Sequence, residues 1–501
     1  MSKVLRAVLA LATTHLVVLL AWYFFGAYGI KRHHLESASF VSASVALLTL
    51  LFSPPRSPSL PAGVADRHLG LVILLVAGVA YAGAVGVGLL SDDYVLRSWV
   101  LDGRLRGDGS PFLRPAALML WRVVFLLGGG AVVLHLLNVL LHITNTILAA
   151  HVAARLGLSR LGVLAATAVF LVWPTQVEPV VWAAGVFDVL STTWMLLALL
   201  IWLTEPAFLS ERLSVLAVCV LTVLSLLTKE SAVALPALAL VAVTPRLLEI
   251  VQSRRQIALL FSMVGLTLAY MGWRLWLNLP VAGTATLTRY VMKEQLSRTF
   301  GTLAVPLSEA TIQSHPAIAC LAVATLIVLG TLSIVTSSQR SRGQVVAVQG
   351  LVWCVVAAAP TIGVLFIGPY LDGSRYLYLS ALGWGLVIGG ILDALSNRRS
   401  LHRLGVAFVA GLVVVAAVEQ RSRLADWRAA AAERDAILGA AIRLADRAQC
   451  GTTTARNLPP RFNGAQLFTN GFAEALREAR PVATGSRPCQ WTWTGSELRQ
   501  D

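Results

Sequence analysis

Residues 69–90 read LGLVILLVAGVAYAGAVGVGLL and lead without a spacer into Ser91-Asp92-Asp93-Tyr94. An apolar run of this length is what a helix needs to cross a lipid bilayer. Because an ionised aspartate costs roughly 2.5–3.5 kcal/mol at the bilayer centre, Asp92 and Asp93 are expected at the water boundary. There the pair can end a solvated helix, hold a cation, or take a proton from a substrate hydroxyl.

The composition is that of a multi-span membrane protein. Of the 501 residues, 57% are hydrophobic and only 13% are charged, which excludes an ordinary soluble domain. Only four of the 40 basic residues are lysine, so the net charge of +15 comes from arginine. In a membrane protein this balance favours anionic headgroups or phosphates, and not nucleic acid, as binding partners.

Hydropathy predicts an all-α bundle of about thirteen membrane-spanning helices. The expected spans are residues 5–29, 37–53, 69–90, 123–150, 159–174, 182–203, 212–228, 231–245, 257–276, 317–336, 345–366, 376–394 and 403–420. Arginines favour one set of loops as cytoplasmic, and carboxylates gather in the opposite loops. The carboxylate-rich face is therefore expected to be extracytoplasmic, in a multi-pass protein of the plasma (inner) membrane.

The pattern divides the chain into three parts. Residues 1–68 add an N-terminal pair of spans, residues 69–420 form the core of the bundle, and residues 421–501 form a small extracytoplasmic domain. This tail opens with a helical pattern and then turns polar. Cys450 and Cys489 lie in its polar part and are the expected disulfide partners in an oxidising compartment.

One expected span carries a polar face. Its members recur at spacings of three, four and three: His135, Asn138, His142 and Asn145. They can line a polar cavity, or they can hydrogen-bond neighbouring helices at about 0.6 kcal/mol each. A metal site is disfavoured because no carboxylate shares the spacing.

A third carboxylate, Glu178, follows Pro174 and immediately precedes Pro179. The prolines predict a non-helical turn on the side of the Asp pair. Carboxylates that face one another are what acid–base chemistry needs. Asp188, about a turn and a half into the next helix, is expected to be buried and paired.

Two basic residues stand at helix ends. Lys229 precedes Glu230 between two spans and is either half of a local ion pair or a lysine aimed at a phosphate. Arg375 lies among Tyr370, Tyr376 and Tyr378 at the start of a span. An aromatic belt explains the tyrosines, whereas the arginine suits a bidentate phosphate clamp.

In order, these motifs resemble the membrane O-mannosyltransferases with tetratricopeptide tails, and more broadly the GT-C glycosyltransferases of the protein O-mannosyltransferase kind. The resemblance runs from about Leu69 to Glu419. It rests on Asp92-Asp93, Phe112-Leu113-Arg114-Pro115, the His135/Asn138/His142/Asn145 face, Val177-Glu178 with Trp182-Ala183-Ala184-Gly185 and Asp188, Lys229-Glu230-Ser231 with Pro236, and Ser374-Arg375-Tyr376-Leu377-Tyr378-Leu379. The chain departs from the family in lacking the tetratricopeptide tail and in carrying Trp173 and Gln176 where relatives often have histidine.

The resemblance implies transfer of a sugar, mannose or another hexose, from a polyprenyl-phosphate donor to an extracytoplasmic acceptor, with inversion at the sugar carbon. The implied catalytic acids are Asp92, Asp93 and Glu178, and the implied donor-phosphate ligands are Lys229, Arg375 and Arg114. His135, Asn138, His142 and Tyr376 would line the cavity. The Asp pair could instead hold Mg²⁺ or Mn²⁺.

Two other classes of function remain open. A transporter or flippase of lipid-linked sugars would also need polar stripes and a phosphate-binding arginine, but it should show matched repeats or broken helices. A non-catalytic scaffold for the C-terminal domain would leave the ordered acids unexplained. The acceptor, whether protein, glycan or lipid, is not specified by the sequence.

Overall fold

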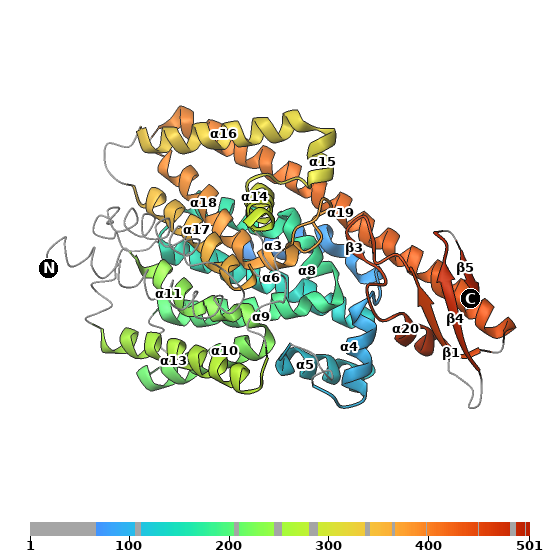
Figure 1. Cartoon of the computed structure of the whole chain (residues 1–501). Coiled ribbons are helices and arrows are strands. Elements are labelled where there is room, and N and C mark those ends of the chain that lie inside the picture. The colour runs from blue at the N-terminus through green and yellow to red at the C-terminus, as the bar shows by residue number, and fades with distance from the viewer. Residues whose placement is uncertain are drawn as a thin grey trace.

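The computed structural model describes residues 67–105, 112–204, 210–244, 253–279, 289–335, 341–362, 366–396, 398–448, 450–480, 487–495 and 497–500. The expected N-terminal pair of spans, 5–29 and 37–53, lies outside these residues. The described chain is a mostly helical multi-span membrane protein with a small C-terminal sheet (Figure 1).

The first half of the bundle is built from helices that vary greatly in length. In chain order they are α3 (Arg67–Tyr81), η2 (Ala82–Gly86), α4 (Asp92–Leu101), α5 (Pro115–Leu126), α6 (Ala131–Leu156), α7 (Arg160–Val172), η3 (Pro174–Gln176), α8 (Val177–Val181), η4 (Ala183–Gly185), α9 (Val186–Leu203), α10 (Glu211–Thr228), η5 (Glu230–Ala234) and α11 (Leu235–Val243).

The second half continues with long apolar helices. They are α13 (Arg254–Trp276), α14 (Arg289–Ala304), α15 (Glu309–Ser314), α16 (Pro316–Val335), α17 (Arg342–Ala358), η7 (Ala359–Thr361), η8 (Ser374–Leu377), α18 (Tyr378–Ala394) and α19 (Arg399–Arg447).

Within the described residues, eight helices are long and apolar enough to cross a membrane. The number is nine if the bent pair Arg160–Val172 and Pro174–Val181, which meet at 49°, counts as one span. All eleven expected spans in this part of the chain have a helical counterpart. Those at 69–90 and 231–245 are shorter apolar helices, so eleven full-length spans was too high an expectation for this part.

The C-terminal part is not all-helical, which corrects the predicted fold class. Strands β1 (Cys450–Arg456) and β4 (Arg487–Trp493) pair in parallel, and β5 (Leu498–Gln500) pairs antiparallel with β4. A short hairpin of β2 (Arg461–Phe462) and β3 (Ala465–Gln466), followed by α20 (Phe472–Ala479), forms the crossover between the parallel strands. A disulfide between Cys450 and Cys489 ties β1 to β4.

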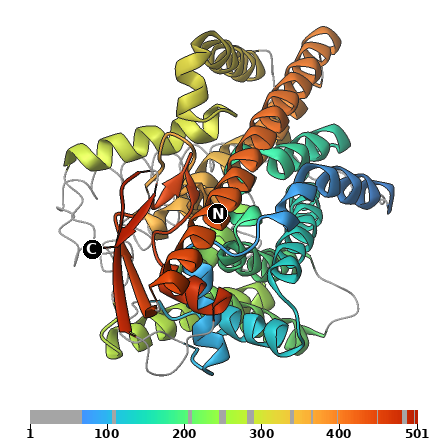
Figure 2. The same ribbon diagram turned by 90° about the vertical axis from the view of Figure 1, so that its right-hand side faces the viewer.

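Helix α19 joins the bundle to this small domain without a break. It has 49 residues and crosses the expected domain boundary at 420 as continuous helix (Figure 2). Beyond residue 420 the helix is rich in alanine and charged residues, so the apolar pattern ends while alanine keeps the helical conformation.

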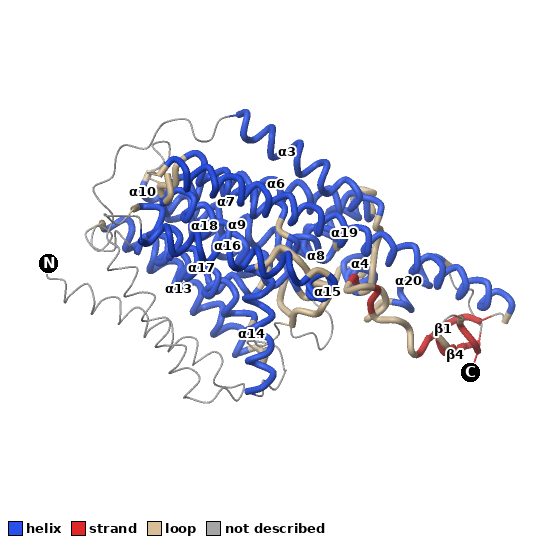
Figure 3. Tube along the Cα trace, turned by 90° about the horizontal axis from the view of Figure 1, so that it is seen from above, coloured by secondary structure: helices blue, strands red, loops and turns tan. Residues whose placement is uncertain are grey.

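Glycines let α18 pack closely between α7 and α17 (Figure 3). A Cβ on Gly389 would lie 2.4 Å from the carbonyl oxygen of Gly162, and one on Gly390 would lie 2.5 Å from that of Gly343. Small residues that allow backbones to approach are the usual means of packing helices in a bilayer.

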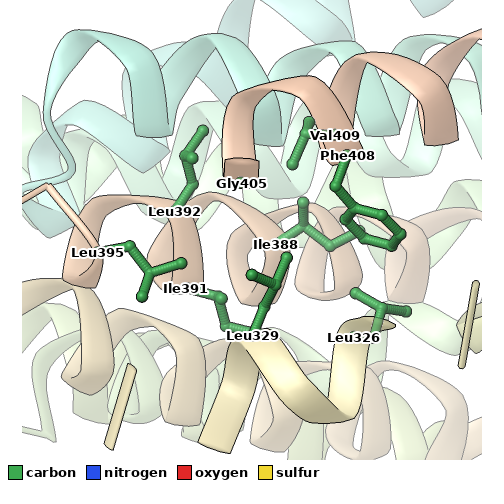
Figure 4. Close-up of a pocket in the computed structure, with 9 residues that line it drawn as sticks. All are labelled: Leu326, Leu329, Ile388, Ile391, Leu392, Leu395, Gly405, Phe408 and Val409. Atoms are coloured by element: carbon green, nitrogen blue, oxygen red, sulfur yellow. The ribbon is translucent and has the colours of Figure 1, made fainter. Parts of the chain in front are cut away.

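The seam between α16, α18 and α19 is less tightly filled. A small apolar gap remains there, with a volume of about 10 Å³. Figure 4 shows the side chains that border it, among them Leu329, Ile388 and Phe408. A space of that size is no larger than one water molecule needs, and no polar side chain borders it. It is a packing gap and not a binding site.

The chain breaks its helical path at Pro174. Trp173, which precedes the proline, is extended (φ −62°, ψ 136°), and α7 ends at Val172. Glu178 then lies in the short helix α8, so the expectation of a non-helical turn at this position was wrong. A second break follows at Trp182, where the backbone is again extended.

The polar side chains of α6 hydrogen-bond backbone carbonyl groups at these breaks. His142 places Nε2 3.1 Å from the carbonyl oxygen of Leu171, and Asn138 donates to that of Trp182 at 2.7 Å. His135 contacts the carbonyl oxygen of Gly88 at 3.0 Å, before α4. Carbonyls freed at helix breaks must find donors inside a membrane protein. His135, Asn138 and His142 therefore hydrogen-bond neighbouring segments, which is the second of the two roles expected from the sequence. They do not line the cavity described below.

We expect Gly389→Ala to lower the free energy of unfolding by about 1–3 kcal/mol, since the added methyl overlaps the α7 backbone. Gly411→Ala is the matched control on α19, where an added Cβ meets nothing within 4 Å. The control should be neutral or stabilised by up to about 1 kcal/mol from helix propensity. Thermal denaturation of both variants in detergent measures the difference, and equal midpoints would contradict the packing argument.

Candidate active site

A cavity of about 500 Å³ lies where the short elements of the first half meet the C-terminal domain. Helix α4 borders it and contacts α20 (Figure 1). Its charged and polar lining residues are Asp92, Arg114, Asp188, Lys229, Arg375, Tyr376, Asn470 and Glu474. Its apolar lining comes from Val95, Leu96, Trp99, Phe112, Leu118, Trp182, Ala184, Phe187 and Gly471.

Asp92 is the carboxylate of the Asp pair that faces the cavity. It is the first residue of α4, and its Oδ1 accepts a hydrogen bond of 2.6 Å from Asn470 Nδ2. A carboxylate at a helix N-terminus also interacts favourably with the helix dipole. Asp92 is partly exposed, so it can meet a substrate from the cavity.

Asp93 points the other way and is fully buried. Its Oδ2 accepts from the backbone N–H of Leu90 and its Oδ1 from that of Ala184, each at 2.9 Å. Burial raises the pKa of Asp93 well above its ordinary value, and the two N–H groups oppose that rise. Asp93 thus joins the start of α4 to the second helix break and does not line the cavity.

A shared cation site on the Asp pair does not fit this geometry. Both oxygens of Asp93 already accept backbone hydrogen bonds, so only Asp92 can offer a free oxygen to the cavity. Among the residues that the structure describes, no group of three or more histidine, cysteine, aspartate or glutamate side chains is placed to hold a metal ion.

Arg375 also lines the cavity and is held by Glu178. Its backbone N–H donates to Glu178 Oε2 at 3.1 Å, and its Nη1 lies 3.7 Å from Glu178 Oε1. The guanidinium stacks over Trp182, with Cζ 4.5 Å from the ring centroid. Glu178 itself is 3% exposed and does not line the cavity, so it positions the arginine and does not face a substrate.

Lys229 forms an ion pair with Asp188, which is buried as expected. The ammonium lies 4.9 Å from the centroid of the Tyr376 ring. The local pair with Glu230 that the sequence suggested does not form. Lys229 therefore adds positive charge at the cavity that is largely balanced by its partner.

Arg114 is bound by Glu230 through three hydrogen bonds. Its Nε donates to Oε1 at 3.3 Å and to Oε2 at 3.1 Å, and its Nη2 donates to Oε2 at 2.9 Å. Arg274 also donates to Glu230, at 3.3 Å. Burial alone would raise the pKa of Glu230, but the charge and hydrogen bonds of Arg114 and the charge of Arg274 hold it below its ordinary value. Arg114 thus faces the cavity with a guanidinium already engaged by a carboxylate.

The cavity is lined by charges of both signs. Arg375, Lys229 and Arg114 supply the cations, and Asp92, Asp188 and Glu474 supply the carboxylates. The rings of Trp182 and Tyr376 lie beside Arg375 and Lys229. Such a site can bind both an anion and a hydroxyl-bearing group.

Sequence reasoning missed the residues that the tail supplies. Asn470, Gly471 and Glu474 line the cavity, although they lie more than 370 positions from Asp92. Nothing in the local sequence around Asn470 distinguishes it from an ordinary turn. Four residues were expected as cavity lining: His135, Asn138, His142 and Tyr376. Of these four, only Tyr376 lines this cavity.

Comparison of the sequence with protein-family models finds no family that matches. A protein O-mannosyl-transferase, Tmtc1 of Drosophila melanogaster, is 33% identical over 199 residues. The matched region is 36% of this chain and spans 23% of the length of that relative.

Two solved structures are similar in overall arrangement. One is ArnT from Cupriavidus metallidurans bound to undecaprenyl phosphate, with a TM-score of 0.47, 14% identity, and coverage of 86% of this chain and 94% of that one. The other is the archaeal oligosaccharyltransferase AglB from Archaeoglobus fulgidus, in complex with an inhibitory peptide and a dolichol-phosphate. Its TM-score is 0.39 and its identity 12%, with coverage of 72% of this chain and 56% of that one.

The two aspartates should respond differently to the same change. Asp93→Asn replaces an acceptor with an NH₂ group facing a backbone N–H, so it should lower the free energy of unfolding by about 1–3 kcal/mol. Asp92→Asn should leave stability nearly unchanged because its side chain is partly exposed. Thermal denaturation in detergent compares them, and a larger loss for Asp92→Asn would contradict these roles.

Proposed function

We propose that this chain is a GT-C glycosyltransferase that moves a sugar from a polyprenyl-phosphate donor to a hydroxyl of an extracytoplasmic acceptor. The observation that carries the proposal is the cavity lined both by the carboxylate of Asp92 and by the cations Arg375, Lys229 and Arg114. The similarity to an O-mannosyl-transferase supports mannose or another hexose as the sugar. The membrane is the plasma (inner) membrane, and the cavity lies on its outer face.

The reaction forms one bond to the sugar and breaks another. The acceptor oxygen attacks the anomeric carbon while the bond from that carbon to the phosphate oxygen breaks, and the phosphate leaves with the bonding electrons. Attack from the face opposite the leaving group inverts the configuration. Asp92 receives the hydroxyl proton, because it is the carboxylate of the pair that faces the cavity.

The basic side of the cavity stabilises the leaving group. A polyprenyl phosphate is weakly basic, so it needs positive charge and not a proton. Arg375 is the residue best placed to supply it, since its closest carboxylate contact is 3.7 Å away and its guanidinium is ordered by stacking on Trp182. The charges of Lys229 and Arg114 are offset by Asp188 and Glu230.

Buried carboxylates set the position of these groups. Glu178 accepts a hydrogen bond from the backbone N–H of Arg375. Asp93, the neighbour of Asp92 in the sequence, accepts hydrogen bonds from the backbone N–H groups of Leu90 and Ala184. In this scheme the three acids named from the sequence divide into one base, Asp92, and two residues that hold cavity residues in place. A rigid arrangement is what orientation-dependent catalysis requires.

Removal of the base should abolish most of the activity. Asp92→Asn keeps the size of the side chain but cannot accept the proton, so turnover should fall by about 10²–10⁴-fold. The assay follows release of free polyprenyl phosphate from a radiolabelled lipid-linked sugar by purified protein. Asp102→Asn is a matched control, since that exposed carboxylate pairs with Arg104 outside the cavity. Near-normal turnover of Asp92→Asn would refute its role as the base.

Substitution of Arg375 tests whether the chain is an enzyme or a carrier. Arg375→Lys keeps the charge but loses the planar fork, so turnover should fall more than donor binding weakens. Arg375→Ala should abolish release, whereas Arg403→Ala, an exposed residue of α19, should release donor phosphate normally. Transbilayer movement of intact donor without any release by the wild-type protein would favour a flippase and overturn the proposal.

A further inference from the structure

The C-terminal domain is bonded to the turn that presents Asp92. The backbone N–H of Ser91 donates to the carbonyl oxygen of Leu467 at 3.0 Å, and the backbone N–H of Asn470 donates to Ser91 Oγ at 3.3 Å. Asn470 Nδ2 then donates to Asp92 Oδ1 at 2.6 Å. Three hydrogen bonds from one segment of the tail therefore reach two adjacent residues of the turn.

The contact leaves no room for a side chain at Gly471. Its φ is +82°, and a Cβ there would lie 2.3 Å from the carbonyl oxygen of Ser91. Ser91 is itself in an unusual conformation for a residue with a Cβ, at φ +49°. Such a conformation costs about 1–3 kcal/mol and persists only where the surroundings hold it. The tail supplies that restraint.

Helix α19 holds the preceding residues from another direction. Arg434, 8% exposed, donates through Nη1 to the carbonyl oxygens of Val87 at 2.9 Å and Leu89 at 2.6 Å. Residues 87–92 are thus held both by α19 and by the segment 467–471. The turn that carries Asp92 depends on the C-terminal domain for its position.

The same domain also contacts the loop that leads to Arg375. Arg461 forms an ion pair with Asp372, and Gly464 packs against Tyr370, whose Cβ lies 2.7 Å from where a glycine Cβ would be. The domain therefore touches both chain segments that bring opposite charges into the cavity. It is placed to fix the distance between the base and the phosphate-binding arginine.

We propose that Asn470 is a positioning residue for the transfer reaction and that the segment 467–474 forms the acceptor-side wall of the active site. This inference rests on the proposed function. By holding Asp92 Oδ1, Asn470 fixes the carboxylate plane and leaves Oδ2 as the oxygen that takes the acceptor proton. Misplacement of a catalytic group by about 1 Å can cost roughly 10²-fold in rate.

The first test changes the hydrogen bond alone. Asn470→Asp has the same shape but replaces the donor with a second carboxylate, and Asn470→Ala removes the group. Both should lower turnover by about 10–100-fold with the donor KM unchanged, because the side chain of Asn470 is bonded to Asp92, whereas Arg375, Lys229 and Arg114 are bonded to other residues. Release of polyprenyl phosphate from the labelled donor is measured at saturating donor. Intact Cys450–Cys489 and monodisperse elution report on folding.

A second pair of variants moves the segment without changing a polar group. Gly471→Ala should push the tail away from Ser91 and lower turnover in the same way. Gly495→Ala is the matched control, since this glycine also has positive φ, at +103°, in the same domain but meets nothing within 4 Å. It should turn over at the wild-type rate.

The possible outcomes test the positioning role of Asn470 separately from the proposed glycosyltransferase activity. Wild-type turnover in both Asn470 variants would overturn the positioning role while leaving the glycosyltransferase in place. If Gly471→Ala does not fold, the Asn470 pair decides, because those variants remove no backbone contact. A wild-type protein that releases no polyprenyl phosphate from any donor would remove the proposed function, and this inference with it.

Discussion

The fold depends on satisfying the backbone where α7 is interrupted. Pro174 and the extended Trp173 end one helix, and Trp182 ends the next short one, so carbonyl groups lose their helical partners in the middle of a membrane protein. Helix α6 supplies the missing donors from side chains spaced along one face. Because these breaks are buried, their carbonyl groups need donors from the protein, and the interruption is stable only with that helix beside it. The interruption in turn puts Trp182, Ala184 and Asp188 at the cavity wall.

Charges at the cavity follow one rule, that each buried ion has a partner. Lys229 pairs with Asp188, Arg114 with Glu230, and Arg375 lies beside Glu178. Unpaired charges in such surroundings would be costly, and paired ones can be retained at little net cost. Arg375 has the loosest of these contacts. Among the three cations, the guanidinium of Arg375 is therefore the one least engaged by a carboxylate.

The sequence was informative where the signal is local. Apolar runs predicted the helices, because the transfer of a residue into the bilayer depends little on distant residues. It could not tell Asp92 from Asp93, since the two differ only in which neighbours fold against them: Asn470 in one case and the backbone of Ala184 in the other. The partner of Lys229 is 41 positions away, and that of Arg114 is 116 positions away. Long-range pairings of this kind leave no mark on a single chain. The helical pattern of the tail was visible in the sequence, but its fusion with the last span into one helix was not.

The length of α19 has a mechanical consequence. At about 1.5 Å per residue, its 49 residues extend roughly 74 Å, more than twice the thickness of a bilayer core. One uninterrupted helix therefore contacts α7 in the bundle and the strands β1 and β5 in the C-terminal domain. Because no loop interrupts α19 between these contacts, the C-terminal domain cannot swing on a flexible linker at this connection.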